Sequence, residues 1–284
     1  MCADINLLVK NRDDMPSLPT IFYQINETVN DQRSSMRDIA QIISADQSLS
    51  ARLLRLVNSA FFGFPSKIDT ISHAVTIIGT KQLRDLALAT TVIQMFKGIP
   101  SDLIRVKPFW QHAIGVGIGS RLLASYHKMP NIEQFFVSGL LHDIGRLILY
   151  GHSPDEAKQA LTLAQEQEEL LHISERKVMG FDHADMGGLL LKEWRLSSSH
   201  EEAVRFHHRP SRSKRFPMEC SITHIADLIA NAMELGTSGE RFVPSLDRQA
   251  WDEIALSTSI LNPMTQQMDQ QYRDIVDLFL EDIQ

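Results

Sequence analysis

The chain is poor in cysteine, which excludes two ways of holding a small fold or a metal together. Only Cys2 and Cys220 occur among its 284 residues. Two cysteines this far apart cannot form a disulfide framework or a cage of thiolate ligands. Any metal site in this protein must therefore use nitrogen and oxygen ligands.

Long hydrophobic runs and an excess of basic charge are also missing. No stretch of about 18 uncharged apolar residues occurs, and the first residues lack the basic and apolar segments of a secretory leader. We therefore expect a cytoplasmic protein that does not enter a membrane. The formal net charge of -7 and the pI near 5.9 argue against broad nucleic-acid binding, which normally needs a basic surface.

Helical periodicity dominates what is present. Apolar residues recur with helical spacing at Met36, Ile39, Ala40 and Ile43, and Ser35 and Asp38 are spaced as a capping box. Alternating, strand-like segments are scarce, so we predict an all-α fold. We also expect residues 155–178 to form one long helical segment that ends at Gly180.

The length of the chain predicts two packed helical lobes. A chain of 284 residues exceeds the usual single-domain size of roughly 100 to 200 residues. The helical pattern breaks between Gly98 and Pro108, which is the best candidate for the boundary. We therefore predict an N-terminal lobe over residues 1–105 and a C-terminal lobe, with its closing helices, over residues 106–284.

The doublet His142-Asp143 is the most informative feature of the second lobe. It lies in the apolar run from Gly139 to Leu149, where an unpaired polar group costs roughly 2 kcal/mol or more to bury. Either the two side chains satisfy each other and the backbone, or they hold a charged species. A metal ion accounts for both side chains at once.

Further candidate ligands follow the same pattern. Of the 11 histidines, all except His73 lie between His112 and His224. The remaining candidates are His112, His183, His207, His208 and Asp227. Each histidine alone has a structural alternative: a hydrogen-bonded core residue, or a helix end in the case of the His207-His208 pair. Asp227 shares a polar helical stripe with Thr223 and Asn231 that could simply face water.

Taken in order, these residues resemble the HD superfamily of metal-dependent phosphohydrolases. The chain is more closely similar to the HDOD family, a regulatory branch of that superfamily, from about Leu18 to Ala232. The matching segments are Leu18-Pro19, the run from Ser50 to Gly63 with its Asn58-Ser59-Ala60, the run from Gly139 to Gly145, and the run from Phe206 to Pro210. The resemblance implies that the C-terminal lobe is an HD-like helical bundle.

Two departures from related patterns are present. Asp46-Gln47 stands where HDOD proteins commonly have Asp-Pro, a local change with little functional weight. Gly145-Arg146 and Arg209-Pro210 stand where HD-GYP cyclic-dinucleotide phosphodiesterases have Gly-Lys and Glu. Cyclic-di-GMP hydrolysis is therefore not supported.

The resemblance also implies a ligand set for two divalent ions. His112, His142, Asp143 and Asp227 would hold the first, and Asp143 would bridge to a second held by His183, His207 and His208. Imidazole and carboxylate ligands suit iron or manganese, which we favour, and are compatible with zinc or nickel. Asp143 would be catalytic as the bridging ligand, and Pro108 occupies the place where some relatives have a Glu for a third ion.

A phosphohydrolase also needs cations for substrate oxygens. Arg146 and Arg209 are the candidate phosphate-binding residues, and Arg146 is also a candidate catalytic residue. The nearby cluster Arg212, Lys214 and Arg215 is better explained as a solvated basic loop.

Two functions follow from the resemblance. The first is an HDOD-type signal-transduction protein that keeps its metal site and binds a nucleotide or a signalling protein. The alternative is an active metal-dependent phosphohydrolase that acts on a nucleotide or phosphodiester. In a third hypothesis the histidines only stabilise a helical scaffold. The sequence does not determine the oligomeric state.

Overall fold

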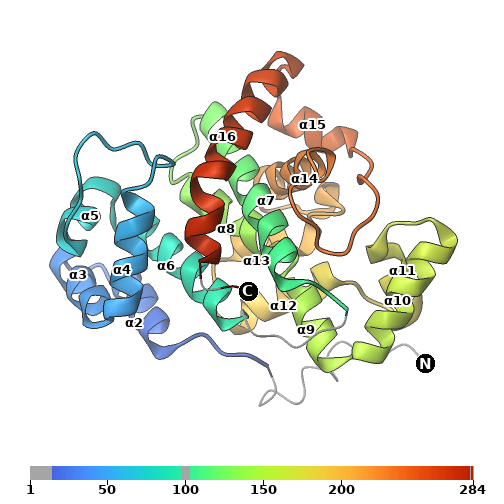
Figure 1. Ribbon diagram of the computed structural model, residues 1–284, viewed down its shortest axis with the longest axis horizontal. Helices are drawn as coiled ribbons and strands as arrows, with labels where there is room; N and C mark the ends of the chain where they lie inside the picture. The colour runs from blue at the N-terminus through green and yellow to red at the C-terminus, as the bar shows by residue number, and fades with distance from the viewer. Residues whose placement is uncertain (1–14, 97–102, 282, 284) are drawn as a thin grey trace.

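Helices make up all the regular structure of the computed structural model, which describes residues 15–96, 103–281 and 283 (Figure 1). No strand occurs within these ranges, so the predicted all-α fold class is confirmed. The helices divide into an N-terminal group, a central bundle that carries the candidate ligand histidines, and two peripheral pairs of helices. These pairs lie within residues 154–179 and 248–280.

The N-terminal group is drawn in blue to turquoise toward the left of Figure 1. It comprises α2 (Thr20–Asn30), α3 (Met36–Ala45), α4 (Gln47–Val57), α5 (Ile71–Ile78) and α6 (Thr80–Met95). The predicted capping box begins α3: Ser35 Oγ accepts from the backbone of Asp38, and Asp38 Oδ2 accepts from the Ser35 N–H at 2.8 Å. Residues from these helices form a hydrophobic core of their own, which runs from Ile25 to Ala87.

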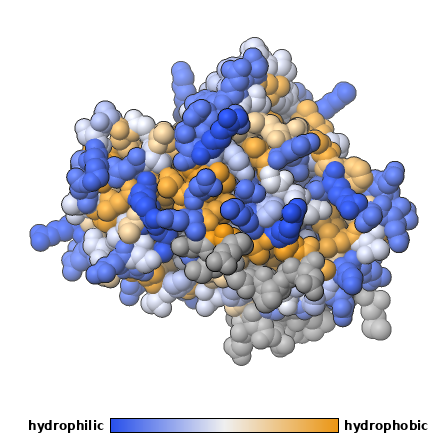
Figure 2. Space-filling model, in the orientation of Figure 1, coloured by the Kyte–Doolittle hydropathy of each residue, from blue (hydrophilic) through white to orange (hydrophobic). Residues whose placement is uncertain are grey.

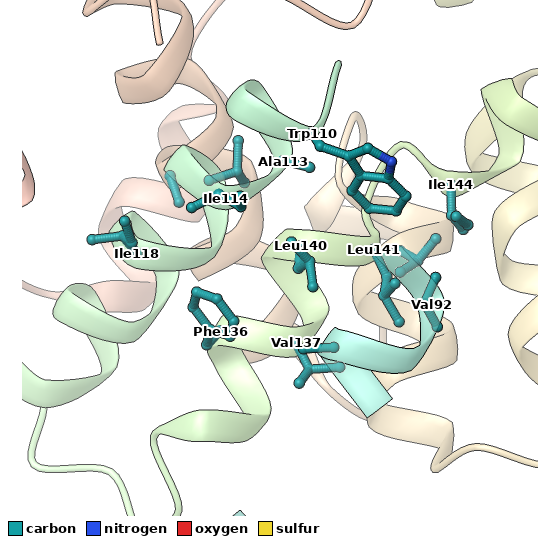
Figure 3. Packing of buried hydrophobic residues seen from close by; sticks show 14 of the residues in the cluster. Val92, Trp110, Ala113, Ile114, Ile118, Phe136, Val137, Leu140, Leu141 and Ile144 are labelled. Carbon is teal, nitrogen blue, oxygen red and sulfur yellow. The ribbon is translucent and has the colours of Figure 1, made fainter. Parts of the chain in front are cut away.

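The central bundle is built around its two longest helices, residues 106–126 and 217–232, which pack against each other. Its members are α7 (Val106–Tyr126), α8 (Glu133–Leu141), α9 (Ile144–His152), α12 (His183–Glu193), α13 (Ser198–Phe206) and α14 (Pro217–Ala232). Side chains of α7 and α8 face each other across a buried apolar layer that Val92 of α6 joins (Figure 3). Two closing helices, α15 (Arg248–Ile254) and α16 (Leu261–Leu280), contribute Ile254, Met264 and Met268 to the same core.

Glycine allows two helices to approach at the His-Asp doublet. A Cβ added to Gly145 of α9 would collide with the backbone carbonyl of His183 in α12 and would lie 2.6 Å from the Gly187 nitrogen. Real Cβ atoms do not come this close to backbone, so only glycine permits the contact. Gly145, two residues after Asp143, therefore allows α9 and α12 to pack closely.

The segment 155–178 is not the single helix that we predicted. It forms α10 (Pro154–Gln167) and α11 (Leu171–Met179), and Glu168 ends α10 in the left-handed region with φ 51°. The turn lets Leu171 pack on the small residues Ala160 and Ala164, which one continuous helix could not bring together. The predicted left-handed cap at Gly180 is present, with φ 86°.

The N-terminal and central groups meet through α6. Leu83 and Leu86 belong to the N-terminal core, whereas Leu88 and Val92 belong to the central one. Residues 97–102, which include much of the predicted boundary from Gly98 to Pro108, lie outside the described residues. The division into lobes at residue 105 remains a prediction.

Hydrophilic residues line much of the outline of the molecule in Figure 2. On the face shown in Figure 2, hydrophobic residues appear between the hydrophilic ones across the middle of the molecule. Within the described ranges, no helix combines the length and the apolar character that crossing a membrane requires.

Candidate metal centre

His112 and Asp227 come together from two packed helices, α7 and α14. Nε2 of His112 lies 3.1 Å from Oδ1 of Asp227, and both residues are buried. The Asn231 side chain donates to the same Oδ1 at 2.7 Å. The alternative that Asp227 faces water is wrong, because the polar stripe that it shares with Thr223 and Asn231 packs into the bundle.

The doublet lies at the junction of α8 and α9. His142 directly follows α8, Asp143 directly precedes α9, and both side chains are fully or almost fully buried. Nδ1 of His142 bonds the Gly139 carbonyl at 2.7 Å, which leaves Nε2 on the inner side of the ring. That nitrogen lies 3.3 Å from Oδ2 of Asp143 and 3.6 Å from Oδ1 of Asp227.

His183 begins α12 and faces the other oxygen of Asp143. Its Nε2 lies 2.9 Å from Asp143 Oδ1, and its Nδ1 lies 2.6 Å from Glu175 Oε2. Glu175 also accepts from the His183 backbone N–H at 2.9 Å. The carboxylate of Glu175 therefore fixes both the ring and the backbone of His183.

His207 and His208 follow the C-terminal end of α13. Nδ1 of His207 bonds the Val204 carbonyl at 2.6 Å, and its Nε2 lies 3.7 Å from Asp143 Oδ1. Nε2 of His208 lies 2.9 Å from Nε2 of His183. The pair therefore completes a group of imidazoles around one oxygen of Asp143.

All seven predicted ligands thus gather into two adjoining groups. In each group the candidate ligand atoms lie within 4.8 Å of one another: one group is His112, His142 and Asp227, and the other is Asp143, His183, His207 and His208. Asp143 belongs to the second group through Oδ1, while its Oδ2 faces His142 of the first. One carboxylate therefore lies between the two sets of histidines.

Several buried polar atoms in these groups have no hydrogen-bond partner among the described residues. They are His112 Nδ1, His142 Nε2, Asp143 Oδ1 and His207 Nε2. Although Asp143 Oδ1 has His183 close by, their alignment does not make a hydrogen bond. Buried polar atoms are rarely left without partners in proteins, so this set of nitrogen and oxygen atoms fits divalent transition-metal ions.

The electrostatics of the groups also favour bound cations. Burial lowers the pKa of His142, but the carboxylates of Asp143 and Asp227 outweigh it and raise the pKa to about 10. Burial raises the pKa of Asp143, but Arg146, His142 and His183 outweigh it, so this pKa lies well below its usual range. Without metal, the site therefore retains protons on imidazole that a metal would displace.

His183 and His207 respond differently to the same surroundings. Burial and the Arg146 charge lower the pKa of His183, but Glu175 and Asp143 outweigh them and raise it to about 9. Burial, followed by the His142 charge, lowers the pKa of His207 to about 3. His207 is therefore neutral at pH 7, which is the form that binds a metal.

Arg146 lies behind Asp143 and is almost completely buried, at 1% exposed. Its Nη1 donates to the Ser238 carbonyl at 2.8 Å and to Ser238 Oγ at 3.0 Å. Its Nε lies 3.4 Å from Asp143 Oδ1 and its Nη2 lies 3.5 Å from His183 Nε2. Most of the guanidinium therefore contacts protein groups, and its predicted roles in phosphate binding and catalysis remain predictions.

Arg209 is more accessible than Arg146. Its side chain is 29% exposed, and Nη2 lies 3.4 Å from Asp182 Oδ2. In the basic loop that follows, Arg215 is 67% exposed and lies 3.7 Å from Glu202. The exposure of Arg215 agrees with a solvated loop, and phosphate binding by Arg209 remains a prediction.

Two residues of α11 that were not predicted from the sequence contact the candidate ligands. Glu175 fixes His183, and the ring of His172 stacks on that of His208 with centroids 4.0 Å apart and planes at 16°. A His and a Glu one helical turn apart in α11 were a usable signal. This signal is hidden by the surrounding sequence, which is acidic and has the composition of a solvated helix.

Comparison with known protein families adds an independent identification. The HDOD domain family model matches residues 15–210, more than half of the chain. The chain belongs to the HDOD domain family. The HDOD match ends before Asp227, so this residue lies outside the matched segment. It joins the other six through the packing of α14 against α7.

Solved structures of similar proteins share the fold. An HDOD domain protein of unknown function from Geobacter sulfurreducens has a TM-score of 0.81 at 23% identity over 97% of both chains. A protein from Shewanella amazonensis SB2B, provisionally assigned as a phosphohydrolase, has a TM-score of 0.74 at 24% identity over 96% of this chain and 97% of its own. At these identities the similarity shows the fold alone.

A curated relative is longer than this chain. An uncharacterized protein of Treponema pallidum (strain Nichols) is 25% identical over 236 residues. The match covers 82% of this chain and 45% of the relative, so the chain spans less than half of that protein's length.

Proposed function

We propose that this protein is an HDOD-type signal-transduction protein of the cytoplasm that retains a dinuclear His/Asp metal site and binds a nucleotide or a signalling protein. The position of Asp143 carries the proposal, because its two oxygens face two separate groups of histidines. A structural relative from Marinobacter aquaeolei VT8, provisionally named a signal-transduction protein, supports the signalling part; its TM-score is 0.70 at 19% identity over 94% of this chain and 59% of its own.

In the proposed site, Asp143 would contribute a ligand to each of two ions, and iron or manganese would be preferred. His112, His142 and Asp227 would complete the first set, and His183, His207 and His208 the second. Bound ions would supply Lewis-acid stabilisation of a phosphoryl group. Glu175 holds the ring of His183, while Arg146 holds Asp143 in place and balances its charge.

A second candidate function is hydrolysis of a nucleotide or phosphodiester. The presence of all seven ligand residues in two adjoining groups favours it. In this case Arg209, the more exposed of the two candidate arginines, would bind substrate phosphate, and Arg146 would act mainly by positioning Asp143.

Metal analysis tests the site before any ligand is known. After reconstitution with Fe(II) or Mn(II), we expect about two ions per chain by elemental analysis. The His142→Ala variant should lose at least one ion, and His73→Ala, an exposed histidine of α5, should match the wild type. Fewer than about one ion per chain in the wild type would favour the scaffold hypothesis.

Turnover then separates the two functions. Iron-loaded and manganese-loaded protein is assayed with nucleotides and generic phosphodiesters, with His142→Ala as the control. Rapid cleavage by the wild type alone, without capture of any partner, supports the hydrolase. Nucleotide or protein binding without cleavage supports the signalling function.

A further inference from the structure

A cavity of about 140 Å³ lies between the N-terminal helices and the central bundle, away from the candidate metal groups. Its walls come from α2 and α6 on one side and from the connection between α12 and α13 with the first turn of α13 on the other. Its polar lining residues are Asn26, Asn30, Arg84, Asp85, Arg195, Ser197 and His200. The two sides are far apart in sequence, so a ligand here would contact both groups of helices.

Arg84 and Asp85 form a fixed pair at one wall. Nε and Nη2 of Arg84 both donate to Asp85 Oδ1, at 2.9 and 2.7 Å, and Asn131 donates to Oδ2 at 3.2 Å. Asp85 is buried, and the Arg84 side chain is 16% exposed. The pair neutralises its own charge and leaves Nη1 of Arg84 without a hydrogen bond to a described residue.

Arg195 adds a positive charge that this pair does not balance. It is exposed, and it makes no ion pair with any residue in the described ranges. Its backbone has the uncommon left-handed φ of 55°, at the turn that begins where α12 ends. The cavity therefore carries one net positive charge from a residue that is accessible to solvent.

His200 supplies a buried polar group to the same cavity. It is 4% exposed, and its Nδ1 lies 2.8 Å from Ser138 Oγ. When the Ser138 hydroxyl donates to Nδ1, Nε2 carries the ring proton and can donate to an anion. The cavity thus offers guanidinium and carboxamide donors and, in this tautomer of His200, an imidazole donor, all of which can bind an oxyanion.

We propose that this cavity binds a small molecule through one oxyanion group, a phosphate or a carboxylate, and that Arg195 makes its main charged contact. The cavity is small beside the roughly 300 to 1,000 Å³ of pockets for drug-sized ligands, so it suits a compact anion. This site is independent of the proposed metal site. It lies at the start of α13, the helix that His207 follows.

Calorimetric titration of the full chain with inorganic phosphate and, separately, with malonate tests the proposal. Saturable binding of at least one anion is expected, with Kd about tenfold higher in Arg195→Gln, which loses one charge-assisted contact. Lys192→Gln is the matched control, because Lys192 is exposed nearby but does not line the cavity. The two anions distinguish a phosphate ligand from a carboxylate ligand.

The same titrations with the His142→Ala variant separate this cavity from the metal groups. Binding that persists within about twofold in His142→Ala and depends on Arg195 supports the proposal. Three results would overturn it: binding of neither anion, an equal loss in Lys192→Gln, or binding that disappears in His142→Ala. Absence of metal from the wild type would defeat the proposed function but leave this cavity site unaffected.

Discussion

The carboxylate of Glu175 bonds both the ring and the backbone of His183, with Oε2 2.6 Å from Nδ1 and 2.9 Å from the backbone nitrogen. The bond to Nδ1 directs Nε2 of His183 at Asp143. A hydrogen-bonded carboxylate behind a histidine fixes its tautomer and raises its strength as a ligand.

Replacing Glu175 with Gln should weaken metal binding without removing a ligand. The expected loss of affinity is about 10-fold to 100-fold, typical of groups that orient metal-binding histidines. Competition with a metal chelator measures it. Glu166→Gln, an exposed glutamate of α10, should retain wild-type affinity. Equal affinity in the Glu175 and Glu166 variants would contradict the assigned role of Glu175.

Replacing Arg146 with Met should destabilise the metal-free protein. The change removes the guanidinium whose charge does most to stabilise the buried Asp143 carboxylate, which costs about 3 kcal/mol in the free energy of unfolding. Urea unfolding in the presence of a chelator measures this. Arg273→Met breaks a pair whose arginine is 73% exposed and should change stability by less than about 0.5 kcal/mol. A small effect at Arg146 would instead favour a role confined to phosphate binding.

Adding a methyl group to Gly145 should separate α9 from α12. Gly145→Ala forces a Cβ against the His183 carbonyl, so we expect a loss of about 2 kcal/mol or more in stability and weaker metal binding. Gly151, in the same helix, has no atom within 4 Å of an added Cβ. Gly151→Ala should therefore stabilise the helix, by up to about 1 kcal/mol. Similar melting temperatures for the two variants would refute the close approach.

The metal-free protein should lose stability as the pH rises above neutrality. The pKa of His142 is raised from 6.5 to about 10 in the folded state, chiefly by Asp143 and Asp227 against the effect of burial. A raised pKa stabilises the fold fully below the unfolded value of 6.5, and this stabilisation disappears as the pH rises through about 10. Stability should therefore fall across this window.

The His142→Gln variant isolates this effect. Urea denaturation measures the unfolding free energies of the metal-free wild type and of His142→Gln. Other titrating groups contribute to both proteins and cancel in the difference. This difference should shrink between pH 6.5 and pH 9.5, as His142 loses its proton. The Asp143 and Asp227 carboxylates are ionised throughout this range, since their pKa values are lowered. A difference that stays constant or grows with pH would show that His142 is not protonated in the metal-free fold.

Much of the site was predictable from residue type and order. The apolar surroundings of His142-Asp143 predicted that both side chains are buried, and the resemblance to the HDOD family supplied the other candidate ligands. The HDOD family assignment and the all-α fold class are confirmed. The break at Glu168 escaped prediction because both α10 and α11 have helical periodicity, and only their packing requires a turn between them.

The sequence by itself determined the chemistry that this protein has available: imidazoles and carboxylates in a helical chain with almost no thiol. Only the tertiary structure decided that Asp143 directs one oxygen to each histidine group, that Arg146 is buried behind it, and that Glu175 supports His183. Helical periodicity assigns a residue to a face of its own helix. The contacts across that face depend on how α7, α9, α11, α12 and α14 pack, and local sequence does not specify this.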